Sequence, residues 1–237
     1  MDDPKAALLA ALPDIPRWLE ARALLAMPDA QLYASPEGFV VSSPLDKLAC
    51  GVGQPAPHLF TQALTEVDPE WTVLAAPEDA DAVGAGIPDF ERERAILHVL
   101  EGPIPRLAAP DPDVIQLGPH DLRRVPDFMA RELERAIHQT EVLALETGGV
   151  IASVAYAASE TARLYDLSID TFGPHRKKGY AARVMRALLD RRSEVKRPVW
   201  GATVSNEESL RLAARLGFRP FEEIVVFTRK SSAGAPS

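Results

Sequence analysis

Hydrophobic positions in the second half of the chain alternate between strand and helix patterns. Apolar runs at 142–146 and 150–158 predict a β-hairpin, because the Gly148-Gly149 step between them suits a tight turn. A strand over 163–171 and a helix over 179–192, with its apolar residues on one face, follow. The same criteria predict strands at 113–117, 199–204 and 223–228 and helices at 127–138 and 207–216.

The first half has the same order of patterns in a weaker form. Helix-like Ala/Leu stretches broken by Pro13 and Pro16 come first. Residues 38–100 then loosely repeat the order found over 150–228, which is two strands, a helix, a strand, a helix and a strand. The strands are expected at 38–41, 48–52, 71–74 and 94–100, and the helices at 58–67 and 79–87.

A proline-rich segment separates the two halves. Four prolines fall between Pro103 and Pro112, which is typical of a linker. The patterns predict an α/β (α+β) fold with a mixed, mostly antiparallel sheet and helices on both faces, in a tandem arrangement. We expect one lobe over residues 1–110, a second over 111–230, and a disordered tail over 231–237, where the residues are small and mostly polar.

Composition narrows the class of protein. With 46% hydrophobic and 25% charged residues, the 237-residue chain has the balance of a packed globular protein rather than a disordered or fibrous one. No apolar run approaches the roughly 20 residues of a membrane span. The N-terminus has acidic residues where a signal peptide has basic ones. We therefore expect a cytoplasmic protein with no membrane partner.

Cysteine and histidine usage argues against a metal site. The single cysteine, Cys50, excludes an internal disulfide framework and a multi-cysteine metal site. The histidines form no HxxH or HExxH pattern, so we expect no metal. They are His58, His98, His120, His138 and His175.

Charge is unevenly distributed along the chain. The net charge is −8, yet residues 175–197 contain nine basic and only two acidic residues. Nucleic-acid binding needs a broad basic face, which an acidic protein with one basic segment does not offer. The pattern instead favours a small ligand that carries phosphate.

The basic segment coincides with a predicted loop at the start of a helix. The loop holds Arg176-Lys177-Lys178, and Gly179 stands where the helix begins. Backbone N–H groups in the first turn of a helix have no intrahelical acceptors, so they form an anion site. Gly179 lacks the Cβ that would keep a phosphate away from the backbone. By itself the segment is also compatible with a solvated basic corner, and it is neither a Walker nor a dinucleotide motif.

Two motifs at the expected separation resemble the GNAT superfamily of acyl-CoA-dependent N-acyltransferases. The family signature Arg/Gln-x-x-Gly-x-Gly/Ala is matched by residues 176–181. The later pattern of an asparagine, a helix and a Gly-Phe pair is matched at Asn206 and Gly217-Phe218. The resemblance covers roughly residues 113–229 and implies a GNAT-like fold with acetyl-CoA as co-substrate.

The resemblance also implies which residues hold the co-substrate. The pantetheine arm would pair with the open strand edge at Ile169, Asp170 and Thr171, much as an added strand does. Asn206 would hydrogen-bond the arm, although it is equally suited to be an ordinary helix cap. The basic side chains and the amides around the pyrophosphate would come from Arg176, Lys177, Lys178, Gly179, Tyr180, Ala181 and Ala182.

The catalytic groups are less clearly marked than the cofactor loop. In this family an amine attacks the thioester directly, and many members use a tyrosine as the acid at the position that is Ala213 here. Another group, or no group, must then protonate the thiolate; Tyr180, Tyr165, Ser209 and water are the candidates.

The base is expected on the strand before the cofactor loop. Asp166, Ser168 and Asp170 recur at period two and share one strand face, which could bind and deprotonate an amine. The same spacing would also suit a plain solvent-facing side, with Tyr165, Leu167 and Ile169 toward the core. Glu146 and Glu160 are weaker candidates.

Taken together, these features indicate an N-acetyltransferase that modifies an amine of a small molecule or a polypeptide. The alternative is a non-catalytic acyl-CoA-binding or sensing protein that has lost its general acid, and a third possibility is a phosphate- or nucleotide-binding module. The first half is interpreted as a degenerate GNAT-like lobe unable to hold acyl-CoA, or as an unrelated cap domain. The acceptor is not specified, and a homodimer is left open.

Overall fold

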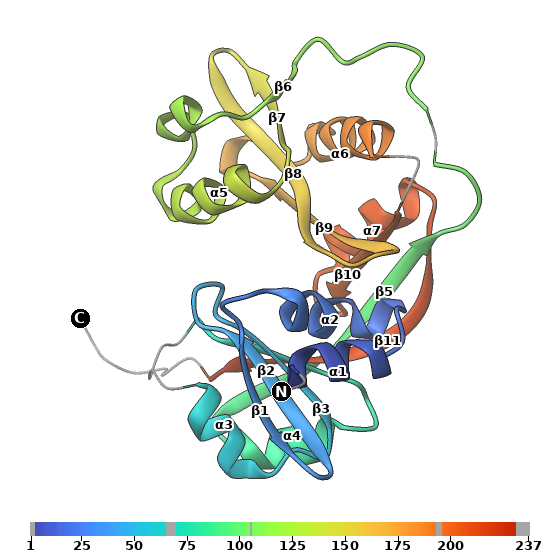
Figure 1. The fold of residues 1–237 in the computed structure, drawn as a ribbon. Helices are drawn as coiled ribbons and strands as arrows, with labels where there is room; N and C mark the ends of the chain where they lie inside the picture. Colours follow the sequence, from blue (N-terminus) through green and yellow to red (C-terminus); the bar gives the residue numbers. More distant parts are fainter. Residues whose placement is uncertain (1–2, 65–69, 105, 193–195, 231–237) are drawn as a thin grey trace. The chain divides into compact units, whose positions relative to one another are not determined.

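The computed structural model describes residues 3–64, 70–104, 106–192 and 196–230 (Figure 1). Contacts divide the chain into two compact units. Unit 1 contains the chain up to Leu97 together with Gly201–Leu210 and the residues from Pro220, and unit 2 contains His98–Trp200 and Arg211–Arg219. The tail predicted at 231–237 and the end of the helix predicted over 58–67 lie outside the described residues.

Unit 1 is a mostly antiparallel sheet with helices on both faces. Its strands lie in the order β1-β2-β3-β4-β11-β5. They are β1 (Gln31–Ser35), β2 (Gly38–Ser43), β3 (Leu48–Gly53), β4 (Thr72–Ala75), β11 (Phe218–Arg229) and β5 (Phe90–Leu100). The helices are α1 (Pro4–Ala11), α2 (Leu19–Ala26), α3 (Pro57–Ala63) and α4 (Ala80–Gly86).

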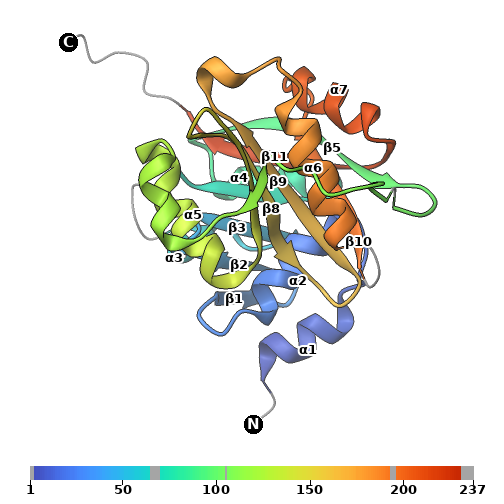
Figure 2. The same ribbon diagram turned by 90° about the horizontal axis from the view of Figure 1, so that it is seen from above.

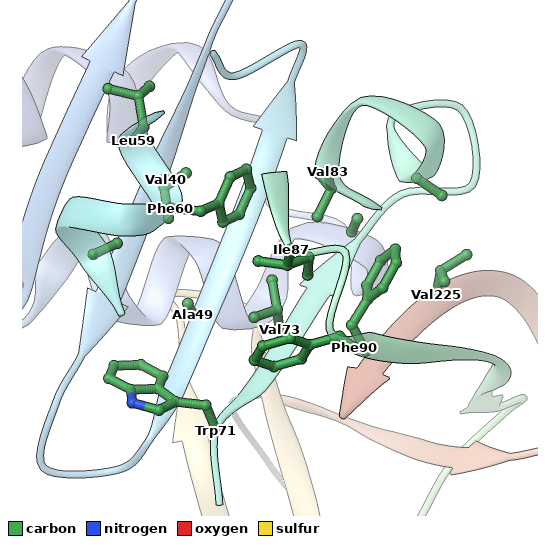
Figure 3. Packing of buried hydrophobic residues seen from close by; sticks show 14 residues of the cluster. Val40, Ala49, Leu59, Phe60, Trp71, Val73, Val83, Ile87, Phe90 and Val225 are labelled. Atoms are coloured by element: carbon green, nitrogen blue, oxygen red, sulfur yellow. The ribbon is translucent and has the colours of Figure 1, made fainter. Parts of the chain in front are cut away.

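Alternation along β2 and β3 sends their side chains to two separate cores. Val40 and Ala49 pack with α3 and α4, whereas Phe39, Val41 and Cys50 pack with α2. Figure 3 shows the first of these clusters, in which the large rings are those of Phe60, Trp71, Phe90 and Phe227. Fully burying a side chain of this size contributes about 1.5–3 kcal/mol, so this core accounts for much of the stability of unit 1.

Unit 2 has strands in the order β5-β10-β9-β8-β7-β6, to which β5 contributes only its last three residues. Helices α5 and α6 cover opposite faces of β7 and β8 (Figures 1 and 2). The remaining elements are β6 (Val114–Gln116), α5 (Asp127–Gln139), β7 (Val142–Thr147), β8 (Val150–Glu160), β9 (Leu164–Thr171), α6 (Tyr180–Arg191), β10 (Arg197–Thr203) and α7 (Glu207–Arg215).

The predicted fold class is confirmed, and the order of elements repeats. The series β2-β3-α3-β4-α4-β5 corresponds to β8-β9-α6-β10-α7-β11. In each series the first two strands pair antiparallel and the next two parallel. The final strand of the second series, however, pairs antiparallel with β4, Val225 opposite Ala75. Because of that long-range pairing, residues from both ends of the sequence form unit 1.

The proline-rich segment is attached to unit 2 where the structure describes it. The Arg183 guanidinium forms a two-pronged ion pair with Asp111, with N···O distances of 2.7 and 2.6 Å, and reaches Asp113 at 2.6 Å. The Leu107 N–H donates to the Asp190 carboxylate at 3.1 Å. The segment therefore runs along α6. None of the described helices combines the length and apolar character needed to cross a membrane.

Candidate active site

The loop between β9 and α6 presents free backbone N–H groups. Lys177 and Gly179 adopt left-handed conformations, with φ of 61° and 82°, and α6 begins at Tyr180. The hydrogen bonds of the helix begin at Arg183, whose amide donates to the Gly179 carbonyl at 3.3 Å. The amides of residues 180–182 therefore have no acceptor within the helix, which is the arrangement that binds anions.

The space above this loop is open. A Cβ added at Gly173 or Gly179 would meet no heavy atom within 4 Å. Gly179 is thus required by its backbone conformation and not by crowding, and a large side chain there would occupy the approach to the amides. The exposed side chains of Lys177 and Lys178 border the same loop. The residues present fit a pyrophosphate group.

Strand β9 has an exposed edge that leads to the loop. It pairs in parallel with β10 at only three positions, the last being Asp166 with Val199. On its other side, β9 pairs with β8 as far as Thr171. In unit 2 no strand pairs with residues 167–171 on the β10 side, over about 16 Å at the usual rise of a strand; the Thr171 carbonyl accepts a hydrogen bond from Arg176 Nε at 3.1 Å. An extended ligand could add to this edge as a further strand.

A polar cluster lies on the face of β8 and β9 that α5 covers. Tyr156 belongs to the core beneath α5, and its hydroxyl donates a hydrogen bond to Glu132 of that helix. Ser168 lies directly opposite Tyr156 on β9, within hydrogen-bonding reach of the phenol oxygen. Asp170 lies two residues along on the same face. The cluster thus combines two carboxylates, a phenol and a hydroxyl beside the exposed edge.

The electrostatics of the cluster favour a proton-binding carboxylate. The pKa of Asp170 is raised from 3.8 to about 6, because burial, the largest cause, and the negative charge of Glu132 together outweigh the opposing charge of Arg176. Burial, followed by the charge of Glu132, also raises the pKa of Tyr156 well above its ordinary value, so this phenol stays protonated. A carboxylate with a pKa near 6 is well matched to taking up and releasing a proton near neutral pH.

Several of the predicted residues lie apart from this cluster. Tyr165 points to the α6 face, where Arg192 lies over its ring at 5.2 Å and burial raises its pKa to about 12. It is six residues before Thr171, or about 20 Å along the strand. Glu146 is paired with Arg124 at 2.5 Å, and Glu160 with Arg192 and Lys196. Ion pairing thus removes both glutamates from the group of free bases.

The remaining predicted residues take the following positions. Ala213 is fully buried in α7 and cannot donate a proton. Asn206 accepts a hydrogen bond from the Ser209 amide at 3.1 Å and so caps that helix. Tyr180 is the first residue of α6, and its ring centroid is 6.2 Å from that of His175. Asp166 occupies the last position of β9 that pairs with β10.

Comparison with known proteins bears on what this arrangement is. Residues 142–227, about a third of the chain, match a family model described as GNAT acetyltransferase. This segment is therefore similar to the GNAT acetyltransferase family. The match begins at β7 and ends in β11, so it contains the exposed edge, the loop and α6. No curated protein matches the sequence.

Solved structures extend the likeness of the GNAT fold to most of the chain. A GCN5-related N-acetyltransferase-like protein from Streptococcus suis has a TM-score of 0.69 at 16% identity, with coverage of 95% of this chain and 96% of that one. A GCN5-related N-acetyltransferase from Kribbella flavida has a TM-score of 0.56 at 14% identity, with coverage of 98% of each chain. A GNAT-family acetyltransferase from Colwellia psychrerythraea has a TM-score of 0.54 at 16% identity, with coverage of 95% of this chain and 94% of that one. At these identities the likeness shows the fold alone.

Two residues of the polar cluster were missed by the sequence reasoning. Tyr156 lies in an apolar strand where an aromatic residue is expected in the core, and Glu132 is one of several charged residues on α5. Only the register of β8 against β9 and the packing of α5 bring them to Asp170. If polar residues at every second position had been sought on the strand adjacent to β9 as well, Tyr156 would have been suggested but Glu132 would not.

The corresponding loop of the first repeat lacks these features. The Gly53 amide donates to Asp79 at 2.8 Å and the Gln54 amide to the Glu37 carbonyl at 2.9 Å. Pro55 and Pro57 have no N–H to offer. In addition, β4 pairs with β3 along its whole length, Leu48 to Gly51 opposite Thr72 to Ala75. This loop has neither free amides at those positions nor an exposed strand edge beside β4.

Proposed function

We propose that the protein is an N-acyltransferase that transfers an acetyl group from acetyl-CoA to an amine. The observation that carries the proposal is the exposed edge of β9, which leads to the amides at the start of α6 and has the proton-binding carboxylate of Asp170 beside it. A chain laid along this edge would have its anionic end at the loop and its other end beside the polar cluster. The GNAT acetyltransferase match over the same elements supports acyl transfer.

Each part of acetyl-CoA has a group of residues suited to hold it. The amides of residues 180–182 would bind the pyrophosphate, and the side chains of Lys177 and Lys178 would add positive charge. The backbone of Ile169 to Thr171 would pair with the pantetheine arm. Arg176, whose Nε donates to the Thr171 carbonyl at 3.1 Å, is positioned between the two. Bound acetyl-CoA would supply the thioester as an activated acyl group.

In the proposed reaction, Asp170 moves the proton. Its carboxylate takes a proton from the ammonium group of the acceptor, and the freed amine attacks the thioester carbonyl carbon. A C–N bond forms, the C–S bond breaks, and the thiolate must then be protonated. Ala213 has no proton to give, so we assign this step to Asp170 as well. A carboxylic acid of pKa about 6 is a stronger acid than a thiol of pKa about 8.5.

The second candidate is a non-catalytic acyl-CoA-binding or sensing protein. The buried Ala213, at the position where related enzymes have the acid, favours it. Both candidates require acetyl-CoA binding, but only an enzyme releases free thiol from acetyl-CoA when an amine is added. Turnover therefore separates them.

Calorimetric titration with acetyl-CoA, with ATP as a comparison, tests the proposed site. We expect one acetyl-CoA site per chain and weaker or no binding of ATP. Gly179→Trp should abolish acetyl-CoA binding because the indole would fill the space above the amides. Gly149→Trp is the matched control, since Gly149 has the same φ of 82° and equally open surroundings in the β7–β8 turn. Equal affinity in the two variants would refute the assignment of the loop.

A further inference from the structure

An exposed aromatic ring lies one helical turn from the polar cluster. Phe128 of α5 is 75% exposed, although its ring meets the buried Phe172 edge-on at a centroid distance of 6.2 Å. Phe128 and Glu132 are four residues apart on the same helix, which places their Cβ atoms about 5–6 Å from each other. Phe172 follows β9 directly, two residues after Asp170.

We propose that this surface, formed by Phe128, Glu132, Asp170 and Phe172, selects an acceptor amine with an aromatic or other apolar substituent and no carboxylate beside the nitrogen. The inference rests on the proposed function and specifies its acceptor. The ammonium group would lie between the carboxylates of Glu132 and Asp170, and the substituent would lie against the Phe128 ring.

The charges of the surface determine which amines it accepts. Glu132 and Asp170 are close enough for each charge to act on the other, and the intervening Tyr156 is neutral. An ammonium group placed there would relieve the repulsion between the partly buried Asp170 carboxylate and the exposed Glu132 carboxylate. An α-carboxylate on the same ligand would restore that repulsion. Arg176 is the one cation that acts noticeably on Asp170 among the described residues, and it borders the phosphate loop.

The apolar part of the surface determines the substituent. The Phe172 ring is only 7% exposed and holds the Phe128 ring edge-on, so one face of Phe128 is free to stack. A ring two carbon atoms away from an amine spans a distance similar to that between Phe128 and Glu132 on the helix. An arylethylamine thus fits both parts, whereas a short alkylamine reaches only the carboxylates.

Three amines test the inference with acetyl-CoA held at saturation. Thiol release is measured with 2-phenylethylamine, with propylamine, which lacks the ring, and with L-phenylalanine, which adds the carboxylate. We expect kcat/KM for 2-phenylethylamine to exceed each of the others by at least about 10-fold, which corresponds to 1.4 kcal/mol. Equal or better turnover of L-phenylalanine would overturn the charge argument, and equal turnover of propylamine would overturn the aromatic one.

Variants locate the preference on the surface. Phe128→Ala should raise KM for 2-phenylethylamine about 2- to 10-fold, leave kcat unchanged, and leave propylamine unaffected. Phe128→Tyr should restore the affinity, since it keeps the ring. Phe221→Ala, at a residue 58% exposed on β11, removes a similar exposed ring as a control. The same loss of affinity for both amines in Phe128→Ala would contradict a stacking role.

Failure of the inference can be told apart from failure of the proposed function. If calorimetry detects no acetyl-CoA binding, the proposed function fails and the inference fails with it. If acetyl-CoA binds and other amines are turned over in preference, only the inference fails. If acetyl-CoA binds and none of the three amines is turned over, the acceptor assignment is refuted and the non-catalytic candidate gains support.

Discussion

If the proposed acetyl transfer takes place, replacing Glu132 by glutamine should lower the pH at which it reaches half of its limiting rate. The proposed role of Asp170 as the base requires its ionised form, so kcat/KM should rise with pH and reach half of its limiting value near pH 6. Glu132 keeps the pKa of Asp170 high because a nearby negative charge disfavours ionisation. Without that charge, Asp170 should ionise at lower pH, and the rise of kcat/KM on the acidic side of the profile should shift to lower pH.

The size of the effect follows from the causes of the raised pKa. Asp170 is raised from 3.8 to about 6, or about two pH units, and burial is the largest cause. Glu132 comes second, so its removal should lower the midpoint by about 0.5–1 pH unit, or about 0.7–1.4 kcal/mol. Glu132→Gln keeps a hydrogen-bond acceptor for Tyr156, so the packing beneath α5 should change little.

The assay is the pH dependence of kcat/KM for the acceptor between pH 4.5 and 8, measured by thiol release. The ionisation of the acceptor is the same for each protein and cancels in the comparison. Glu134→Gln is the control, since two residues along a helix is about 200° around its axis and so points away from the cluster. If the midpoint of the pH profile is unchanged in Glu132→Gln, or if it shifts equally in Glu134→Gln, then that midpoint does not depend on the interaction between Asp170 and Glu132.

Three further predictions concern stability and stoichiometry. Because the pKa of Asp170 is raised in the folded state, its ionisation lowers the free energy of unfolding as pH rises from 3.8 through about 6. Asp170→Asn should therefore stabilise the fold by about 1–2 kcal/mol at pH 8, a range that allows for the partial exposure of the side chain. At pH 3.5 the substitution should have no effect, and urea denaturation at the two pH values measures both. Arg183→Met should speed amide hydrogen exchange around Asp111, and unchanged exchange would mean that the ion pair does not hold the segment. Asp79→Ala frees the Gly53 amide but exposes no strand edge, so calorimetry should still find one acetyl-CoA site per chain.

Local patterns in the sequence predicted most of the elements and the loop. Strand β9 and helix α6 were placed within one or two residues, because alternation and an apolar helix face are properties of neighbouring positions. Ser168 and Asp170 lie opposite Tyr156 and Val154 of β8 and so share a face as predicted, whereas Asp166 is paired with Val199 of β10. Strand β1 was missed because its residues are at most half-buried, so its hydrophobic alternation is weak.

Features that depend on distant parts of the chain could not be predicted. The hydrogen bond from Tyr156 to Glu132 joins a strand to a helix that precedes it by more than ten residues. The ion pair that occupies Glu146 depends on how the chain before α5 folds back on β7. Neither interaction changes the local hydrophobic pattern, because the sequence does not distinguish a glutamate in an ion pair or hydrogen bond from a solvated one.

The pairing of β11 gives the first repeat a structural role even without a ligand site. Val225 and Phe227 of β11 are buried in the core of unit 1, and their backbone pairs with β4. Residues 111–230 expressed alone would therefore expose two large apolar side chains and an unpaired strand edge, which promotes aggregation. We expect this fragment to lack a cooperative urea transition and to lose acetyl-CoA binding, because β11 continues directly from α7. Addition of residues 1–110 as a separate chain should restore both. A fragment that unfolds cooperatively and binds acetyl-CoA by itself would show that the first repeat is not needed to hold the last strand.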